Sequence, residues 1–278
     1  MLKLLASALV VLALVTGTAL AAKGGPAPGV SVGWDGTVDS TGAVRYVALP
    51  AATTTTIAAV RTSDGRVLRY GTIRGVYGIP LVAFDGTAEG VSRDGRTLVL
   101  ADAAARADET HLAVLRTATL RLAKTITLPG RWAYDALSPD GRTLYATQYL
   151  GTGASPRYQV RSVSLASGKP FGAPLVDERE PDEEMNGSPW ARVRSANGAW
   201  AYTLYAKTGG TGFVHALDTT GRRAFCIDLP WRTTAQRLAA VRLSLAAGGR
   251  TLELAKPGGS RLAVVDTRTF EVTAFAKP

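Results

Sequence analysis

A short turn motif that recurs along the chain restricts the folds that the chain can adopt. Its clearest copy is Ser138, Pro139, Asp140 and Gly141, flanked on both sides by runs of β-forming residues. Proline presets φ, aspartate can hydrogen-bond the nearby backbone, and glycine supplies the positive φ that a tight reversal needs. The motif therefore predicts a β-hairpin wherever it occurs.

The motif returns four more times in weaker form, and its last glycine is then Gly42, Gly95, Gly198 or Gly249. Taken with Gly141, these glycines are separated by 53, 46, 57 and 51 residues. A second marker, between the third and fourth strands of each unit, lies at Thr62, Thr117, Ala166, Thr219 and Thr267. Regular periods of this size are typical of arrays of supersecondary units, so the two markers together predict five units.

Each unit has room for four short strands joined by tight turns, and no helical periodicity is found beyond the N-terminal region. The alanine-rich stretch 238–245 is predicted as strand because it directly precedes a turn motif. Residues 112–115 and 262–265 are apolar throughout, as expected of strands covered on both faces. Sheets arranged radially cover one another in this way. We therefore predict an all-β chain that folds as a β-propeller of five four-stranded blades.

The residues around the markers, LSPDGRTLYAT and VVDTRTFEVTAF, resemble the YVTN type of bacterial β-propeller repeat. That repeat is related in pattern to WD40 and TolB-like blades, although no Trp-Asp pair recurs from unit to unit here as it does in WD40 repeats. The resemblance covers nearly all of residues 30–276. It implies the fold but no single function, because such propellers include scaffolds, ligand-binding modules, lactonases and dehydrogenase subunits.

The predicted blades divide the chain at the markers. They span residues 29–78, 79–128, 129–184, 185–231 and 232–277, so that 30–278 forms a single domain. A six-bladed ring is the alternative, if the loosely patterned stretch 73–90 contains further strands. The ring is expected to close where the first blade, from Val30 to Trp34, meets the fifth, from Phe270 to Phe275.

The N-terminal region has the pattern of a secretory signal peptide. Lys3 precedes an apolar run at 4–15, and an Ala-x-Ala sequence follows at 19–21. The run is shorter than the ~20 residues that a membrane-spanning helix needs, although a membrane anchor is the alternative. We predict that residues 1–22 are removed on export to the periplasm, cell wall or medium, that 23–29 form a linker, and that the mature protein has no transmembrane span.

Composition narrows the class of partner. The net charge is +10 at pH 7, but the arginines are dispersed through the units, which together with export argues against nucleic acid. Anionic ligands of the cell envelope are expected instead, unless the charge serves solubility alone. Cys226 is the only cysteine, so no intrachain disulfide can form, and we interpret it as a small core residue. We expect a monomer.

A candidate ligand-binding rim follows from the predicted architecture. The first strand of each blade lines the central channel of a propeller, and the loops that enter these strands form one rim. The predicted site residues on that rim are Asp85, Glu89, Arg131, Trp132, Tyr134, Trp190, Arg192, Trp231, Arg232 and Arg237. Aromatic faces and guanidinium groups suit a sugar, carboxylate or phosphate. Alternatively, the tryptophans fill space between blades and the arginines pair with Asp85, Glu89 and Asp135.

No catalytic, metal or cofactor site is predicted. The stretch 177–184 holds six carboxylates in eight residues, but it matches no calcium-loop spacing and is predicted as a solvated loop. The histidines, His111 and His215, lack metal-site spacing, and no Gly-x-Ser-x-Gly motif is found.

The leading hypothesis is an exported ligand-binding or scaffold module of the cell envelope, whose partner is a protein or an anionic or sugar-like ligand. The alternative is a propeller-type hydrolase or lactonase acting on a small or sugar-derived substrate. Such an enzyme would need His111 or His215 at the channel mouth, beside Asp85, Glu89 or Asp135.

Overall fold

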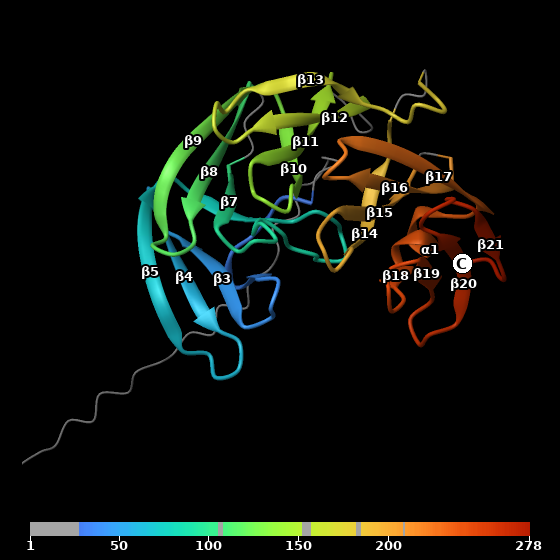
Figure 1. Ribbon diagram of the computed structural model, residues 1–278, viewed down its shortest axis with the longest axis horizontal. Helices are drawn as coiled ribbons and strands as arrows, with labels where there is room; N and C mark the ends of the chain where they lie inside the picture. Colours follow the sequence, from blue (N-terminus) through green and yellow to red (C-terminus); the bar gives the residue numbers. More distant parts are fainter. Residues whose placement is uncertain (1–27, 105–107, 152–156, 182–184, 208) are drawn as a thin grey trace, which may run out of the picture.

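The computed structural model describes residues 28–104, 108–151, 157–181, 185–207 and 209–278. Five antiparallel sheets follow one another in chain order around a common centre (Figure 1). Each sheet corresponds to one predicted unit, so the prediction of five units is confirmed. We call each sheet a blade and number the blades in chain order.

The blades are built from the following strands. Blade 1 contains β2 (Gly33–Val38), β3 (Val44–Pro50), β4 (Thr54–Arg61) and β5 (Val67–Arg74). Blade 2 contains β6 (Tyr77–Pro80), β7 (Thr97–Asp102), β8 (Glu109–Arg116) and β9 (Arg121–Pro129). Blade 3 contains β10 (Trp132–Leu137), β11 (Thr143–Leu150), β12 (Arg157–Ser164) and β13 (Pro170–Leu175). Blade 4 contains β14 (Ser188–Arg194), β15 (Trp200–Ala206), β16 (Thr211–Asp218) and β17 (Arg223–Arg232). Blade 5 contains β18 (Arg242–Leu245), β19 (Thr251–Ala255), β20 (Arg261–Asp266) and β21 (Val272–Ala274).

One additional strand departs from the prediction. Val30 and Ser31, expected in the first blade, form β1 (Val30–Ser31) and pair antiparallel with Pro80 and Ile79 of β6. Blade 2 therefore has five strands. The pairing satisfies backbone groups at an edge of β6 that would otherwise be open.

A short helix also departs from the prediction, because part of the stretch 238–245 is not strand. Helix α1 (Ala235–Ala239) includes Leu238, and β18 begins only at Arg242. The Thr234 side chain caps the helix by accepting a hydrogen bond from the backbone N–H of Arg237, and Leu238 is buried. A good cap and a run of helix-forming residues thus outweigh position in the repeat.

The repeated turn is held by the same bonds in several blades. In blade 3, Ser138 Oγ donates to Asp140 Oδ1 at 2.6 Å and accepts from the backbone N–H of Thr143 at 2.9 Å. Ser92 in blade 2 and Ser195 in blade 4 make equivalent bonds. The hydroxyl thereby supplies a local bridge across the hairpin, which explains why serine opens the motif.

The two sequence markers contact each other in four of the blades. A threonine hydroxyl at the second marker donates to the carbonyl of the turn glycine: Thr62 to Gly42 at 2.6 Å, Thr117 to Gly95 at 2.5 Å, Thr219 to Gly198 at 2.8 Å and Thr267 to Gly249 at 2.8 Å. In blade 3 the equivalent residue is Leu165 and not Ala166, because the backbone N–H of Leu165 donates to the carbonyl of Arg142, directly after the turn glycine, as the marker threonines do in the other blades. Leucine has no hydroxyl, so blade 3 lacks this bond. The two periods therefore reflect one structural contact between the inner and outer hairpins of a blade.

Apolar clusters fill the spaces between successive blades. Ile57 of blade 1 and Leu100 of blade 2 belong to one cluster, and equivalent clusters join blades 2 and 3, 3 and 4, and 4 and 5. Strands of blades 2, 3 and 4 are apolar on both faces because each of these sheets has a neighbour on both sides, as predicted. Residues 262–265 of blade 5 were expected to be covered in the same way, but their sheet has a neighbouring blade on one face only.

The array does not close into a ring. No strand pairing or core cluster joins blade 1 to blade 5 in the part of the chain that the structure describes, and Figure 1 shows them at the two ends of an arc. Trp34 and Phe275, expected at the closing contact, are 62% and 58% exposed. The outer face of blade 5 carries an ion pair between Glu253 and Arg261, and packing it against another sheet would desolvate these charges.

No described helix has the length and apolar character required to cross a membrane. The predicted signal peptide, residues 1–22, lies outside the described residues.

Candidate ligand-binding pocket

The inner strand of blade 2 is interrupted by a loop at residues 81–88. A single bridge between Leu81 and Ala88 closes the loop, and pairing with β7 resumes when the backbone N–H of Val99 donates to the carbonyl of Gly90. The stretch 73–90, considered above as a source of further strands, thus contains the end of β5, then β6 and this loop. The described residues form no sixth sheet.

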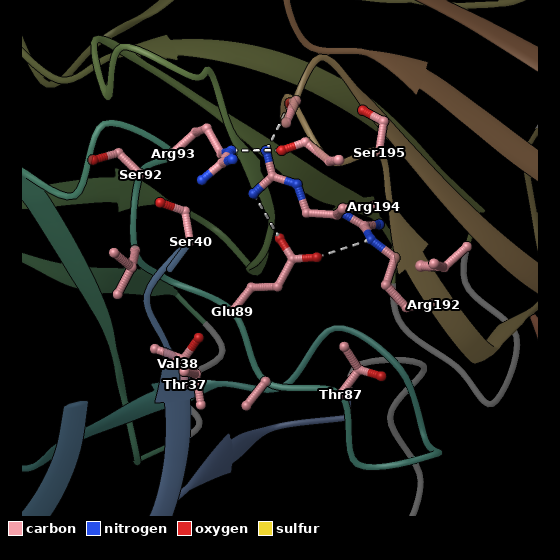
Figure 2. Close-up of a pocket in the computed structure, with 15 residues that line it drawn as sticks. Thr37, Val38, Ser40, Thr87, Glu89, Ser92, Arg93, Arg192, Arg194 and Ser195 are labelled. Carbon is pink, nitrogen blue, oxygen red and sulfur yellow. Dashed lines mark hydrogen bonds and ion pairs between the residues drawn. The ribbon is translucent and has the colours of Figure 1, made fainter. Parts of the chain in front are cut away.

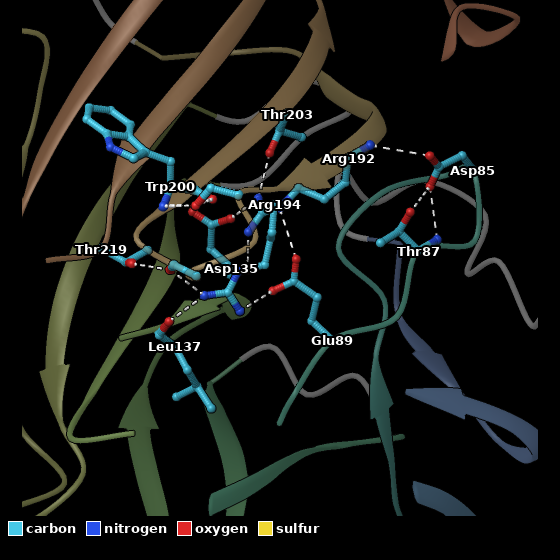
Figure 3. Close-up of polar contacts among 12 residues, drawn as sticks. Asp85, Thr87, Glu89, Asp135, Leu137, Arg192, Arg194, Trp200, Thr203 and Thr219 are labelled. Carbon is cyan, nitrogen blue, oxygen red and sulfur yellow. Dashed lines mark hydrogen bonds and ion pairs between the residues drawn. The ribbon is translucent and has the colours of Figure 1, made fainter. Parts of the chain in front are cut away.

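The loop crosses from blade 2 to blade 4. The backbone N–H groups of Phe84 and Asp85 donate to the carbonyls of Pro189 and Trp190 at 2.9 and 3.0 Å. Asp85 Oδ2 also accepts from the backbone N–H of Arg192 at 3.3 Å (Figure 3). These bonds pair the loop with the inner edge of β14, so they connect two blades that are not neighbours in the array.

Arg192 lies at the centre of a buried ion network. Its Nε lies 3.1 Å from Glu89 Oε1, and its Nη1 lies 2.7 Å from Asp135 Oδ1. Nη1 also donates to Thr203 Oγ1 at 2.6 Å (Figure 3). Burial alone would lower the pKa of Arg192, but Glu89 and Asp135 outweigh it and raise the pKa above its usual value. The guanidinium therefore stays charged and is fully paired.

Arg194 extends the network toward the repeated turns. Its Nη1 lies 3.3 Å from Glu89 Oε2, and its Nη2 donates to the carbonyls of Leu137 and Gly198, both at 2.9 Å. One carboxylate, that of Glu89, therefore bridges Arg192 and Arg194. Side chains from blades 2, 3 and 4 meet here, and the alternative expectation for Arg192 and its carboxylates is confirmed.

A pocket of about 320 Å³ opens beside this network. Its wall is formed by the turns of blades 2 and 4, through Ser92, Arg93 and Ser195, and by the end of β2 in blade 1, through Ser40 (Figure 2). Glu89, Arg192 and Arg194 also line it. The pocket therefore lies at the ends of the first strands of the blades, where each strand leads into the repeated turn. The predicted rim lies at the opposite end, where those strands begin.

Positive charge and hydroxyl groups dominate the pocket. Three arginines face one carboxylate, because Arg93 joins Arg192, Arg194 and Glu89 in the lining. Arg93 Nε donates to the carbonyl of Ala196 at 2.6 Å, and its two terminal nitrogens have no hydrogen-bond partner among the described residues. Hydroxyls come from Thr37, Ser40, Thr87, Ser92 and Ser195. This lining suits an anionic group attached to a hydroxyl-bearing molecule.

The three tryptophans of the predicted rim do not come together. Trp132 is buried in the cluster between blades 2 and 3, and its Nε1 donates to the carbonyl of Pro129. Trp231 is buried between blades 4 and 5. Trp190 packs against Phe84, with ring centroids 5.2 Å apart. For Trp132 and Trp231 the space-filling alternative holds.

The other predicted rim residues lie outside the pocket. Arg131 stacks over the Tyr149 ring at 5.6 Å, Arg232 is exposed at the end of β17, and Arg237 is exposed in α1. The Tyr134 hydroxyl is buried without a hydrogen-bond partner in the described part of the chain, and burial, aided by the charge of Glu89, raises its pKa.

Neither histidine lies at the channel mouth. His215 is fully buried at the interface of blades 3 and 4, edge-on to the Tyr205 ring at 6.2 Å. Burial lowers the pKa of His215, although the charge of Asp135 opposes the shift. His111 instead contacts Asp102 and Glu109, at 3.5 and 3.1 Å. The arrangement that a hydrolase would need is therefore not formed by these residues.

The acidic stretch 177–184 is only partly a solvated loop, which corrects the prediction for its first residue. Asp177 is buried, accepts from the backbone N–H of Cys226 at 2.7 Å and pairs with Arg179 at 2.6 Å. Residues 182–184 lie outside the described part. Cys226 itself packs partly buried against the cluster between blades 3 and 4, consistent with a core role.

Sequence reasoning missed the residues of the turns, chiefly Arg93, Ser40 and Ser195. Arg93 occupies the position of Pro139 in the repeated motif, so a cation at a turn was visible in the sequence. The aromatic residues directed attention to the opposite ends of the same strands. Only Asp85, Glu89 and Arg192, among the predicted site residues, are brought together.

Comparisons with known proteins agree with this architecture. No protein-family model and no curated protein matches the chain. A functionally unknown protein from Desulfotomaculum acetoxidans is 12% identical, with a TM-score of 0.52, over 86% of this chain and 67% of the other. TolB from Acinetobacter baumannii is 14% identical, with a TM-score of 0.48, over 84% of this chain and 52% of TolB. The periplasmic gluconolactonase of Pseudomonas aeruginosa is 16% identical, with a TM-score of 0.48, over 86% of this chain and 68% of the gluconolactonase.

At these identities the similarity concerns the fold alone. The chain spans about half the length of TolB. The succession of radial four-stranded sheets is that of a β-propeller, here arranged as an open arc.

Proposed function

We propose that the protein is an exported module of the cell envelope that binds a small anionic, hydroxyl-bearing ligand, such as a sugar acid, in the pocket between the turns. The observation that carries the proposal is the excess of arginine over carboxylate in a pocket of about 320 Å³. That volume lies within the usual range for small-molecule sites. The ligand class is the one expected from the sequence, but the site lies at the other end of the inner strands.

Arg93 is the residue best placed to hold the anion. Arg192 and Arg194 already form ion pairs with Glu89 and donate hydrogen bonds to backbone carbonyls. Of the three guanidinium nitrogens of Arg93, only Nε donates a hydrogen bond to another described residue. A carboxylate or phosphate can accept two bonds from the remaining guanidinium nitrogens. The Ser40 hydroxyl can bond a hydroxyl of the same ligand, and the Thr87 hydroxyl, which donates to Asp85 Oδ1 at 2.7 Å, can accept from one.

Calorimetric titration with glucuronate, glucose and inorganic phosphate tests this function. We expect glucuronate to bind more tightly than either glucose or phosphate, because it alone offers both an anionic group and hydroxyls. Arg93→Gln should weaken glucuronate binding by roughly 10- to 100-fold, the loss of about 1.5 to 3 kcal/mol from charge-assisted bonds. Arg232→Gln, on the originally predicted rim, is the matched control and should leave binding unchanged. Equal affinity for glucuronate and glucose would contradict the proposal.

Export is the second part of the proposal, and it rests on the N-terminal pattern. N-terminal sequencing of the protein recovered from the envelope or medium should begin near Lys23. Retention of Met1 in that material would contradict cleavage. We also propose that the mature protein is a monomer in isolation and that nucleic acid is not its ligand, which sedimentation and a filter-binding assay would check.

A further inference from the structure

Blade 1 has an apolar outer face that no other described blade covers. Val47, Ala58 and Val60 form a cluster to which blade 1 alone contributes, whereas each larger apolar cluster joins two successive blades. Large apolar side chains on this blade are also unusually exposed, with Val67 at 45% and Tyr70 at 72%. A concentration of exposed apolar residues of this kind marks an interaction surface.

The strand register places these residues on one face. Tyr70 lies opposite Ala58, and Val67 lies opposite Val60, in the pairing of β4 with β5. Val60 in turn lies opposite Arg45 of β3. Side chains of directly opposed residues project from the same side of a sheet, so the cluster and the exposed residues form a single surface.

The face is bordered by positive charge. Arg45 and Arg74, which lies opposite Thr54, are both exposed, and neither has an ion-pair partner among the described residues. Strands β3, β4 and β5 contain no acidic residue. The complementary surface is therefore apolar with carboxylates at its border.

Neither end of the same array offers that complement. The outer face of blade 5 is polar, with Glu253 paired to Arg261 at 2.6 Å and Ser244 opposite Glu253. A second copy of blade 1 would add its own Arg45 and Arg74, and the only carboxylate within its four strands is that of Asp35 in β2, so arginines would face an excess of arginines. The occupant is therefore neither blade 5 nor a second blade 1.

We propose that the outer face of blade 1 docks a different protein through an apolar surface bordered by carboxylates. This surface is separate from the pocket at the turns, and the proposal does not depend on the ligand bound there. In structural terms, the partner supplies the cover that a preceding blade gives to each of blades 2 to 5.

A matched pair of amphipathic peptides tests the proposal with the purified protein. The peptides share their apolar residues and carry either glutamate or lysine at the polar positions. In fluorescence anisotropy the glutamate peptide should bind at least 10-fold more tightly. The Arg45→Glu/Arg74→Glu variant should reverse that preference, and Tyr70→Asp should weaken both peptides. Glu253→Gln/Arg261→Gln on blade 5 is the control and should change neither affinity.

Four results would overturn the proposal. The first is equal or absent binding of the two peptides, and the second is binding that the charge reversal leaves unchanged. The third is a dimer in sedimentation that Tyr70→Asp dissociates, which would assign the face to a second copy. The fourth is flotation with phosphatidylglycerol vesicles that Tyr70→Asp abolishes, which would assign it to a membrane surface.

Discussion

The interfaces between blades are held together by apolar packing, whereas the centre of the array is held together by buried ion pairs. Between blades, aliphatic and aromatic side chains pack in a repeated pattern, as Leu204 and Leu254 do between blades 4 and 5. At the centre, one buried arginine joins carboxylates from blades 2 and 3 to blade 4. The interfaces connect neighbours, whereas the ion network and the loop 81–88 connect blade 2 to blade 4. An array that does not close thus gains a cross-link that a stack of nearest neighbours lacks.

Removing Arg192 should have the largest effect, because it leaves Asp135 buried without an ion-pair partner and Glu89 paired with Arg194 alone. We expect Arg192→Met to lower the free energy of unfolding by about 3 to 5 kcal/mol in urea denaturation. Adding Glu89→Gln and Asp135→Asn removes both buried charges and should recover a large part of that loss. If the triple variant were no more stable than Arg192→Met, the ion pairs would not be the source of the central cross-link.

The interface between blades 4 and 5 should depend on apolar volume instead. Leu254 is fully buried there, so Leu254→Ala should lower the free energy of unfolding by about 2 to 5 kcal/mol. Tyr70→Ala, on the uncovered face of blade 1, is the control and should stay within about 0.5 kcal/mol of the parent. A comparable loss at both positions would mean that the two faces are covered to a similar extent.

The interfaces could be predicted from the sequence because their chemistry repeats. The turn glycines and the marker threonines recur at similar intervals, and in four blades a hydrogen bond joins the two markers. Apolar strands such as β8 then required a neighbouring sheet on both faces. Local turn chemistry and strand pattern were therefore enough for the number of blades and the strand order within them.

The centre could not be predicted because its contacts occur once and join distant residues. Arg192 meets Glu89 and Asp135 across 103 and 57 residues of chain. No periodic signal marks such a pair. The open arc was missed for a related reason: closure was assumed from the fold and from the apolar run 262–265, although Glu253 and Arg261 in the flanking positions already argued against a covered outer face on blade 5.

His215 combines both kinds of region, since it is a titratable group in an otherwise apolar interface. Its pKa is lowered by burial from a usual value near 6.5, so the folded protein binds the proton more weakly than the unfolded chain does. Above pH 6.5, His215 is neutral in both the folded and the unfolded chain, and the free energy of unfolding is not reduced by its protonation. As the pH falls below that value, the unfolded chain takes up the proton first, so the free energy of unfolding decreases.

Thermal unfolding between pH 7.5 and 5 checks this expectation. The midpoint should fall less steeply with decreasing pH in His215→Phe than in the parent protein. Leu254→Ala is the control, since it lowers stability without removing a titratable group, and it should keep the parent slope. An unchanged slope in His215→Phe would show that another group accounts for the pH dependence.

The smallest effect should come from restoring the contact that blade 3 lacks. A hydroxyl at position 165 would lie where four other blades place the donor to the turn glycine, here Gly141. Leu165 is buried in the cluster between blades 2 and 3, so Leu165→Thr and Leu165→Val both lose apolar volume. We expect the free energy of unfolding of Leu165→Thr to exceed that of Leu165→Val by about 0.5 to 1.5 kcal/mol, the usual net value of one hydrogen bond, because the two side chains have nearly the same shape and only threonine has the hydroxyl. Equal stability of the two variants in urea denaturation would mean that β-branching, and not the hydrogen bond between markers, explains the preference for threonine at this position.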